Sequence, residues 1–247
     1  MRVLSAEFKK LKGSKIVIPM LLLPLFSVIF GSINYYGNLE VLQSEWVSLW
    51  TQTYLFYGFI FFPVLSAVYC AYSWNGEHRH NNFKLLLTAP VSHSKLLLSK
   101  ISVVFFLNLF TQLYFIALFL IAGSTFNFKS EFPADFIYWL IVATIFSLVN
   151  ISVQNFLSLK IKSFAIPVGL SLLIAMVSLL GSMASYSSES LKFLEYCFPS
   201  ASLTVAMNHY PKILYTFKEF IVMGILSLIV FIIFYGLQKR ELMRKLN

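Results

Sequence analysis

Hydrophobic and polar positions alternate along this chain in long blocks, and the apolar blocks predict membrane-spanning helices. Each block is close to the roughly 20 residues that cross a hydrocarbon core of about 30 Å in a helix rising about 1.5 Å per residue. None carries an acidic or basic residue in its interior, although Glu219 opens the last one. The predicted spans cover about residues 16–36, 53–74, 101–123, 136–158, 163–184 and 219–237.

The polar segments between these spans differ in charge, and the difference predicts their orientation. One alternating set holds 15 of the 19 Lys and Arg residues: 1–15, 75–100, 159–162 and 238–247. The other set holds the remaining four and six of the ten acids: 37–52, 124–135 and 185–218. Basic loops stay on the cytoplasmic side. We therefore expect both termini to be cytoplasmic, and the very short 159–162 connection predicts that its two spans are antiparallel neighbours.

Composition supports a helical membrane protein and argues against a soluble one. The chain is 58% hydrophobic and only 12% charged, whereas soluble domains carry about 25% charged residues. The fold class that follows is all-α and polytopic, a single transmembrane domain over residues 1–247. The net charge of +9 reflects the cytoplasmic bias of basic loops, so we expect no nucleic-acid partner. Cys70 and Cys197 fall at opposite faces, which argues against a disulfide between them.

Two polar segments predict short helices beside the spans. In residues 1–15, Val3, Leu4, Phe8 and Leu11 recur at helical spacing among basic residues. This pattern is typical of a helix lying in the membrane interface, and the alternative is a plain basic leader.

The outward segment 185–218 contains two amphipathic pieces too short to span, Leu191–Phe198 and Ala201–Met207. They are compatible with a hairpin of half-helices that dips into the outer leaflet, where other protein must cover the turn. An ordinary, partly helical extracellular loop is the alternative.

Polar residues inside the spans are candidates for a substrate pathway. Asn108, Thr111 and Gln112 share one helix face, because residues three and four apart lie on the same side. Amides in lipid need partners, so these faces should point to other helices or to a polar cavity; helix-to-helix hydrogen bonding is the alternative to substrate contact. The complete candidate set is Gln52, Tyr57, Asn108, Thr111, Gln112, Asn150, Gln154 and Asn155.

Several kinds of chemistry have no residues to carry them in this sequence. There is no G-x-x-x-x-G-K-[ST] phosphate loop, so the chain should not hydrolyse ATP alone. We expect no catalytic residues, no metal site and no cofactor on this chain. The spans also lack an ionisable group for a proton or sodium relay.

The longest charged interruption in the first half of the chain is Trp74–Lys100, and it predicts a contact with a partner protein. It contains a short amphipathic segment that begins at Phe83 and closes at Pro90, hung between two spans. An amphipathic helix can place apolar side chains in a partner's groove, and charged residues at the rim can set its register. Glu77 can equally be an acid that stabilises a helix N-terminus.

Together these segments resemble the permease subunits of type-2 ABC transporters. The resemblance rests on A-E-F-K-K-L-K-G-S near the start, N-G-E-H followed by F-K-L-L-L-T-A-P-V-S and L-L-L-S-K in the first inner loop, and six spans with a long, partly helical last outer loop. Within that group the chain is most similar to lantibiotic-immunity, bacitracin-resistance and toxin-peptide exporter permeases of Gram-positive bacteria.

The resemblance implies a mechanism and a setting. Residues 1–15 would be the elbow helix, and the 75–100 loop would hold the coupling helix that sits in a cleft of a cytoplasmic ATP-binding subunit, which carries the ATP and Mg. Two permeases would pair in the bacterial cytoplasmic membrane, in contact with membrane lipid. The implied coupling residues are Glu77, Arg79, Phe83, Lys84, Leu86, Leu87 and Pro90.

The expected activity is ATP-driven export of amphipathic or hydrophobic peptides, such as antimicrobial, bacteriocin or cytolytic toxin peptides. Export of a lipid or drug is an alternative, because uncharged polar stripes suit these cargoes almost as well. A self-sufficient channel or scaffold without an ATPase partner is a further alternative, and it would have no use for a partner-binding loop.

Overall fold

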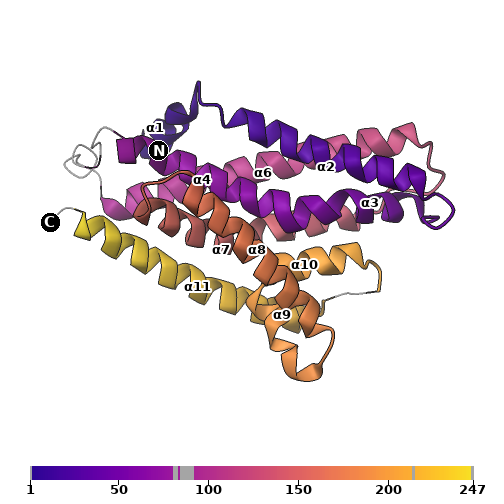
Figure 1. The fold of residues 1–247 in the computed structure, drawn as a ribbon. Helices are drawn as coiled ribbons and strands as arrows, with labels where there is room; N and C mark the ends of the chain where they lie inside the picture. Colours follow the sequence, from indigo (N-terminus) through magenta and orange to yellow (C-terminus); the bar gives the residue numbers. More distant parts are fainter. Residues whose placement is uncertain (1, 80–82, 84–91, 213–214, 246–247) are drawn as a thin grey trace.

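The computed structural model describes residues 2–79, 83, 92–212 and 215–245. All regular structure in this part of the chain is helical, and it includes six helices long and apolar enough to cross a membrane. The predicted fold class is therefore confirmed. The long helices form one elongated bundle, and both terminal regions lie at the same end of it (Figure 1).

The six long helices agree in number and order with the predicted spans. They are α2 (Val17–Gly37), a continuous helix made of α3 (Glu45–Phe56), η1 (Tyr57–Phe61) and α4 (Phe62–His78), then α6 (His93–Thr125), α7 (Asp135–Lys160), α8 (Ala165–Ser185) and α11 (Phe217–Arg244). The shorter helices are α1 (Arg2–Leu11), η3 (Glu189–Leu191), α9 (Phe193–Cys197) and α10 (Pro199–Asn208).

Two helices begin well before the predicted spans, and packing and capping explain why. The second begins at Glu45 rather than near residue 53, because Trp50 is fully buried among rings of neighbouring helices. The third begins at His93 rather than near residue 101, where the side chain of Ser92 accepts a hydrogen bond from the Lys95 backbone. N-cap serines supply an acceptor that the first helical turn otherwise lacks.

A short π-helix, η1, interrupts the second long helix just before Pro63. Proline has no N–H and its ring clashes with the carbonyl four residues earlier, so a regular α-turn cannot continue through it. A wider turn absorbs this defect, as π-turns inside α-helices commonly do. Gly58 in this turn lets α10 approach closely: a Cβ added there would lie 2.5 Å from the Thr204 methyl group.

Stacked aromatic rings form the core of one half of the bundle. The Trp50 ring lies 4.7 Å from that of Tyr54 and 4.3 Å from that of Phe136, nearly parallel to both. Tyr57 stacks on Phe115 at 4.1 Å. Offset-stacked ring pairs add stability beyond the area they bury. These rings join α3, η1, α6 and α7 into a rigid unit.

The segment between α8 and α11 is partly helical, as the sequence predicts, and α10 is buried along most of its length. Residues from Pro199 to Met207 in α10 are buried apart from Ser200. It packs against α3, η1, α7 and α8, so it runs inside the bundle rather than over its surface. This arrangement agrees with a half-helix that returns between longer helices.

The prediction that the helices flanking 159–162 are close neighbours holds only in part. α7 and α8 meet near their short connection, but α8 packs mainly against α4, α9 and α10. The reason is α10, which contacts both α7 and α8 and occupies space between them.

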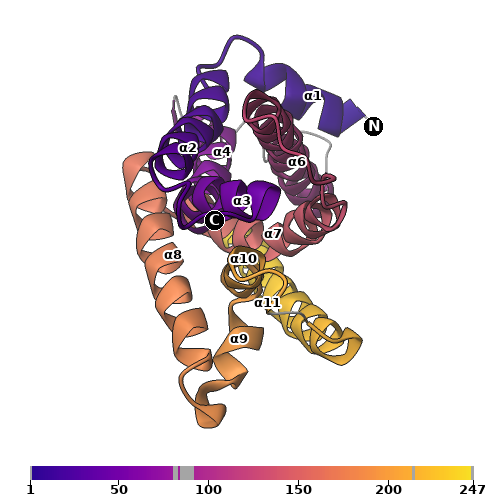
Figure 2. The same cartoon turned by 90° about the vertical axis from the view of Figure 1, so that its right-hand side faces the viewer.

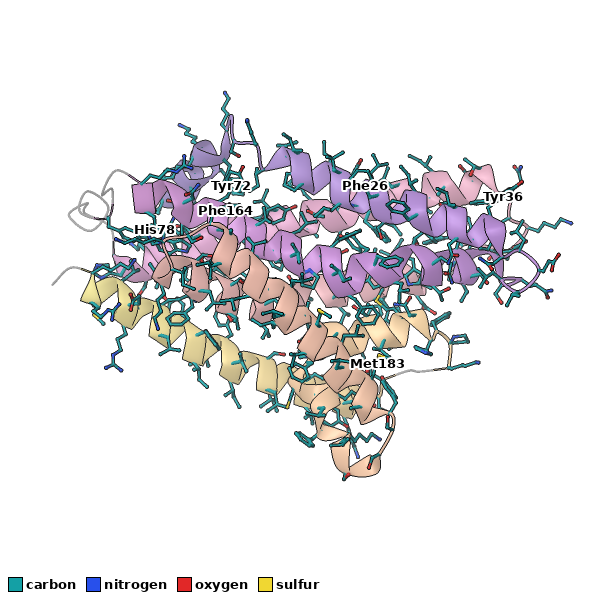
Figure 3. All side chains as sticks on the ribbon, viewed as in Figure 1. Phe26, Tyr36, Tyr72, His78, Phe164 and Met183 are labelled. Atoms are coloured by element: carbon teal, nitrogen blue, oxygen red, sulfur yellow. The ribbon has the colours of Figure 1, made fainter. Side chains whose placement is uncertain are left out.

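The N-terminal helix α1 and many exposed apolar side chains lie at the periphery of the bundle. α1 runs across the long helices at the end where α4 ends and α6 begins (Figures 1 and 2). Apolar side chains such as Phe26 on α2 and Met183 on α8 are exposed, at 42% and 56%, and point away from the bundle (Figure 3). α11 is even less covered, with few buried residues.

Candidate functional site

A buried group of charges joins α1 to the ends of α4 and α6 that flank the predicted coupling loop. We call Glu7, Lys10, Ser73, Glu77 and Lys100 the charge junction. Lys100 is fully buried, and its ammonium lies 2.8 Å from a Glu7 carboxylate oxygen and 3.0 Å from one of Glu77. It also donates to the Ser73 carbonyl at 2.6 Å. All three ammonium protons therefore have acceptors.

A second lysine completes the junction from its edge. The Lys10 ammonium lies 2.6 Å from both Glu7 and Glu77, so two carboxylates face two ammonium groups and the junction is neutral. Burial alone would lower the pKa of Lys10, but hydrogen bonds and attraction from Glu7 and Glu77 outweigh it and raise that pKa. A buried charge left without its partner is strongly destabilising, so these four groups hold three helices in one arrangement.

Local sequence spacing creates this geometry. Glu7 and Lys10 are three residues apart on α1 and therefore share one face. Glu77 lies in the last turn of α4 and Lys100 in the second turn of α6, and these helices pack together. The Lys100 ammonium also lies 4.6 Å from the centre of the Trp74 ring, an attraction worth about 0.5–2 kcal/mol.

Trp74 extends the network from the charge junction to α7 and α11. Its indole N–H donates to Asn155 at 2.5 Å, and Asn155 donates to Gln238 at 2.8 Å. Gln238 in turn donates to the Ser152 carbonyl. These hydrogen bonds join α4 to α7 and α7 to α11, so the three helices are held together at the end of the bundle that carries the charge junction.

Lys245 and His78 contact the end of α7 at the same end of the bundle. Lys245 donates to the Leu159 carbonyl at 2.8 Å, where α7 ends and its carbonyls lack helical partners. Its ammonium also lies 4.2 Å from the centre of the Phe83 ring. His78 meets the Ser158 carbonyl at 2.8 Å, and Figure 3 shows its side chain at this end.

A comparison with known families identifies the chain. Residues 3–178, more than two thirds of the chain, match the model of the family described as ABC-2 family transporter protein. The chain belongs to this ABC-2 family. No curated protein matches it. The protein is therefore a multi-pass membrane permease of an ABC transporter, a transport subunit whose family implies a separate ATP-binding partner.

The structure places three of the permease's predicted coupling residues, and two of them face inward. Glu77 is 5% exposed and already paired within the charge junction, so its carboxylate does not lie at an open rim as we expected. Phe83 packs against Trp74 and His78 rather than projecting outward. Arg79 is exposed. The remaining coupling candidates lie outside the described residues: Lys84, Leu86, Leu87 and Pro90.

The predicted substrate-pathway residues of the permease do not form one surface. Asn108 bonds to Ser66 and Ser147 between three helices, and Thr111 bonds to Tyr69. These contacts match the helix-to-helix alternative.

Four other pathway candidates are also buried or hydrogen-bonded to neighbouring helices. Tyr57 is buried in the aromatic core, Gln112 is 2% exposed, and Asn155 belongs to the Trp74 network. Gln52 accepts from Asn34 at 2.5 Å near the opposite end of the bundle. Their burial and pairing explain why the polar stripes face inward without lining a common path.

Asn150 and Gln154 are the two candidates that border a cavity. Its volume is about 200 Å³, and it lies among η1, α4, α7, α8, α10 and α11. Asn150 donates to Ser200, which also lines the cavity, at 3.3 Å.

Sequence reasoning did not predict the charge junction itself. Glu7 is the one acid among five basic residues in the first 15, and that isolation was the available signal. Lys10 and Lys100 looked like ordinary cytoplasmic cations, and Gln238 lay beyond the predicted last span. Their pairing depends on helix packing that periodicity does not reveal.

Proposed function

We propose that this permease works as the membrane-spanning half of an ATP-driven exporter of amphipathic or hydrophobic peptides. The observation that carries the proposal is the charge junction, which fixes the elbow-like α1 to both helices that flank the coupling loop. A force applied to that loop reaches α4 and α6 directly and α1 through ion pairs. Rigid elements with two stable arrangements transmit such forces.

The coupling surface follows from this geometry. We propose that a cytoplasmic ATP-binding subunit, carrying ATP and Mg, binds the segment from Arg79 to Pro90. Glu77 then acts as a positioning residue that anchors the loop to the bundle, and Phe83 supports the loop from within through Trp74. Basic residues at the rim, such as Arg79, set register and association rate more than affinity.

Pairing with a second permease is part of the same proposal. Leu173, Val177 and Leu180 on α8 are exposed at 59%, 59% and 65% and share one face. Lipid or a second copy can cover such a face. We propose a dimer in a bacterial cytoplasmic membrane, in cells that resist or secrete peptides.

Among the pathway candidates, we propose that Asn150 and Gln154 contact cargo, because they border the cavity. The lining is neutral and mostly apolar, which suits the uncharged segments of a peptide. Export of a lipid or drug remains the second candidate function, since the same lining favours any uncharged apolar molecule.

The test is purification of the tagged permease from its native membrane in mild detergent. We expect a stoichiometric ATP-binding protein to copurify, with ATPase activity that an amphipathic peptide stimulates. Arg79→Glu should reduce its recovery about tenfold or more, because it reverses a charge on the proposed contact surface. Glu77 substitutions are less informative here, because they disturb the charge junction first.

Lys129→Glu is the matched control, because Lys129 is an exposed cation at the opposite end of the bundle. It should leave recovery of the ATPase unchanged. If no ATPase copurifies with the intact permease, the self-sufficient channel or scaffold becomes the better hypothesis. Stimulation of the ATPase activity by lipid but not by peptide would favour the second candidate function, export of a lipid or drug.

A further inference from the structure

A second, polar cavity of about 390 Å³ lies beside the charge junction, between α1, α4 and α6. Its volume falls within the range of about 300–1,000 Å³ that is typical of ligand pockets. Lys10, Gly76 and Arg79 line this cavity and are exposed. Figure 3 shows Tyr72, another lining residue, near the end of the bundle that carries α1. A molecule outside the bundle can therefore reach this space.

The charges around the polar cavity favour an anion. Glu7 and Glu77 both line it, but each carboxylate already lies within 3.0 Å of the ammonium groups of Lys10 and Lys100. These four charges cancel. Arg79 adds a positive charge that has no partner among the described residues. The lining is therefore cationic overall, and a cationic ligand would meet this guanidinium without an unpaired carboxylate to offset it.

Several hydrogen-bond donors at the polar cavity have no acceptor within the part of the chain that the structure describes. They are the Tyr72 hydroxyl, the Asn75 amide and the Arg79 guanidinium, which follow one another by three and four residues and so share one face of α4 and its C-cap. All three side chains are half-buried or exposed. Lys10 uses two of its three ammonium protons on the two carboxylates. A phosphate group accepts several such bonds, and those from charged donors are the strongest.

The position of the polar cavity indicates that the phosphate belongs to a lipid. The basic loops predict that this end of the bundle is cytoplasmic, and basic pockets between helices on that side of a membrane bind anionic headgroups. Leu11 and Val103 add an apolar edge to the lining, against which the start of an acyl chain can lie. Three exposed lysines on or just after α1 attract anionic lipid to the same region: Lys9, Lys12 and Lys15.

We infer that the polar cavity binds the phosphate group of an anionic phospholipid headgroup, through the donors of Tyr72, Asn75 and Arg79 and the third ammonium proton of Lys10. The bound headgroup joins α1 to α4 beside the charge junction, so it strengthens the helix arrangement that the ion pairs hold. The site is separate from the proposed cargo cavity, and lipid binding needs neither cargo nor ATP.

The test measures which lipid the full-length permease retains. The protein in an uncharged detergent is incubated with an equimolar mixture of phosphatidylglycerol and phosphatidylcholine that carry the same acyl chains, and the lipid that remains bound after gel filtration is quantified. We expect about fivefold more phosphatidylglycerol than phosphatidylcholine, the effect of one uncompensated basic residue at an anionic headgroup. Millimolar inorganic phosphate, added in a parallel incubation, should not displace the lipid, because free phosphate lacks the acyl chains.

Two substitutions distinguish the polar cavity from a general attraction to the basic surface of α1. Gly76→Leu places a side chain in the cavity without changing any charge, and it should fold because an added Cβ at Gly76 meets nothing within 4 Å. Asn75→Asp puts a negative charge on the lining at nearly unchanged volume. Each should abolish the preference for phosphatidylglycerol.

Gly37→Leu and Asn38→Asp are the matched controls. Both residues are exposed, an added Cβ at Gly37 also meets nothing within 4 Å, and neighbouring Tyr36 lies at the opposite end of the bundle (Figure 3). Neither control should change the preference. All four variants leave the proposed ATPase surface intact, so failure of lipid binding and failure of ATPase copurification are separate results.

Three results would overturn the inference. Equal retention of the two lipids by the unmodified permease would show that the cavity does not select an anionic headgroup. A preference that survives in Gly76→Leu or in Asn75→Asp would assign it to the exposed lysines of α1. Displacement of phosphatidylglycerol by inorganic phosphate would replace the lipid with free phosphate as the ligand. If Gly76→Leu does not fold, the comparison of Asn75→Asp with Asn38→Asp decides alone.

Discussion

At the residue scale, Lys100 is the most consequential side chain in the permease. It is a fully buried cation, bonded to two carboxylates and a carbonyl from two other helices. Replacing a buried ion pair as a whole is often tolerated, whereas removing one member leaves an uncompensated charge. We therefore expect that replacing Lys100 alone costs more stability than replacing Lys100 together with one of its acidic partners.

We predict that Lys100→Met lowers the free energy of unfolding by about 3–5 kcal/mol, measured by detergent-titrated unfolding. Lys95→Met is the matched control on the same helix, and because Lys95 is exposed it should change stability by less than about 0.5 kcal/mol. The double change Lys100→Met with Glu77→Gln should lose less than Lys100→Met alone, because Glu7 and Lys10 remain paired. Equal losses in the two lysine variants would contradict the role of the charge junction.

At the element scale, what the sequence could predict depends on whether a signal is local. Hydropathy located all six long helices, and the i, i+3, i+4 spacing of Asn108, Thr111 and Gln112 correctly predicted an inward face. The early start at Glu45 was missed because polar residues such as Ser48 and Gln52 weaken the apolar pattern there. The partners of Glu7 and the burial of α10 depend on contacts between distant segments, and no periodicity encodes them.

The short helix α9 carries a titratable group of its own, Glu195. Burial raises the pKa of this carboxyl above its ordinary value of 4.5, and Glu219 raises it further, while the Tyr215 hydroxyl and Lys192 act in the opposite direction. A raised pKa means that folding favours the protonated acid. Its contribution to stability is therefore fully present below pH 4.5 and is lost as the pH rises through the folded-state pKa.

We predict that hydrogen exchange in α9, corrected for the intrinsic effect of pH, becomes faster as the pH rises above 4.5. Glu195→Gln should remove this dependence, because the amide stays neutral at every pH. The exchange of α7, which lacks this carboxyl, serves as the internal reference. A dependence that persists in Glu195→Gln would assign the effect to another group.

At the scale of the whole molecule, the two cysteines report the orientation that the basic loops predict. Cys70 is buried on α4 and Cys197 is exposed at the end of α9, and both are free thiols. We expect an impermeant maleimide on intact cells to label Cys197 and not Cys70. Lys129→Cys, in the 124–135 segment that the basic loops predict to face outward, should gain labelling, whereas His93→Cys should react only after the cells are permeabilised.

Labelling of His93→Cys in intact cells would reverse the orientation. Lys129→Cys makes the test independent of local packing around Cys197, since Lys129 is exposed between α6 and α7. Labelling of both outward positions together with protection of His93→Cys would place the charge junction on the cytoplasmic side.

The charge junction also sets an order of events during synthesis of the chain. Glu7 is made before its buried counter-ion Lys100, which follows 93 residues later. At about 5–20 residues per second, the Glu7 carboxylate waits on the order of 5–20 seconds for its buried counter-ion. During that interval Glu7 has only Lys10 of its own helix as a counter-ion, so we expect α1 to stay at the surface until the start of α6 emerges. α1 thus takes its final position only after α2 and the helix made of α3, η1 and α4 have been made.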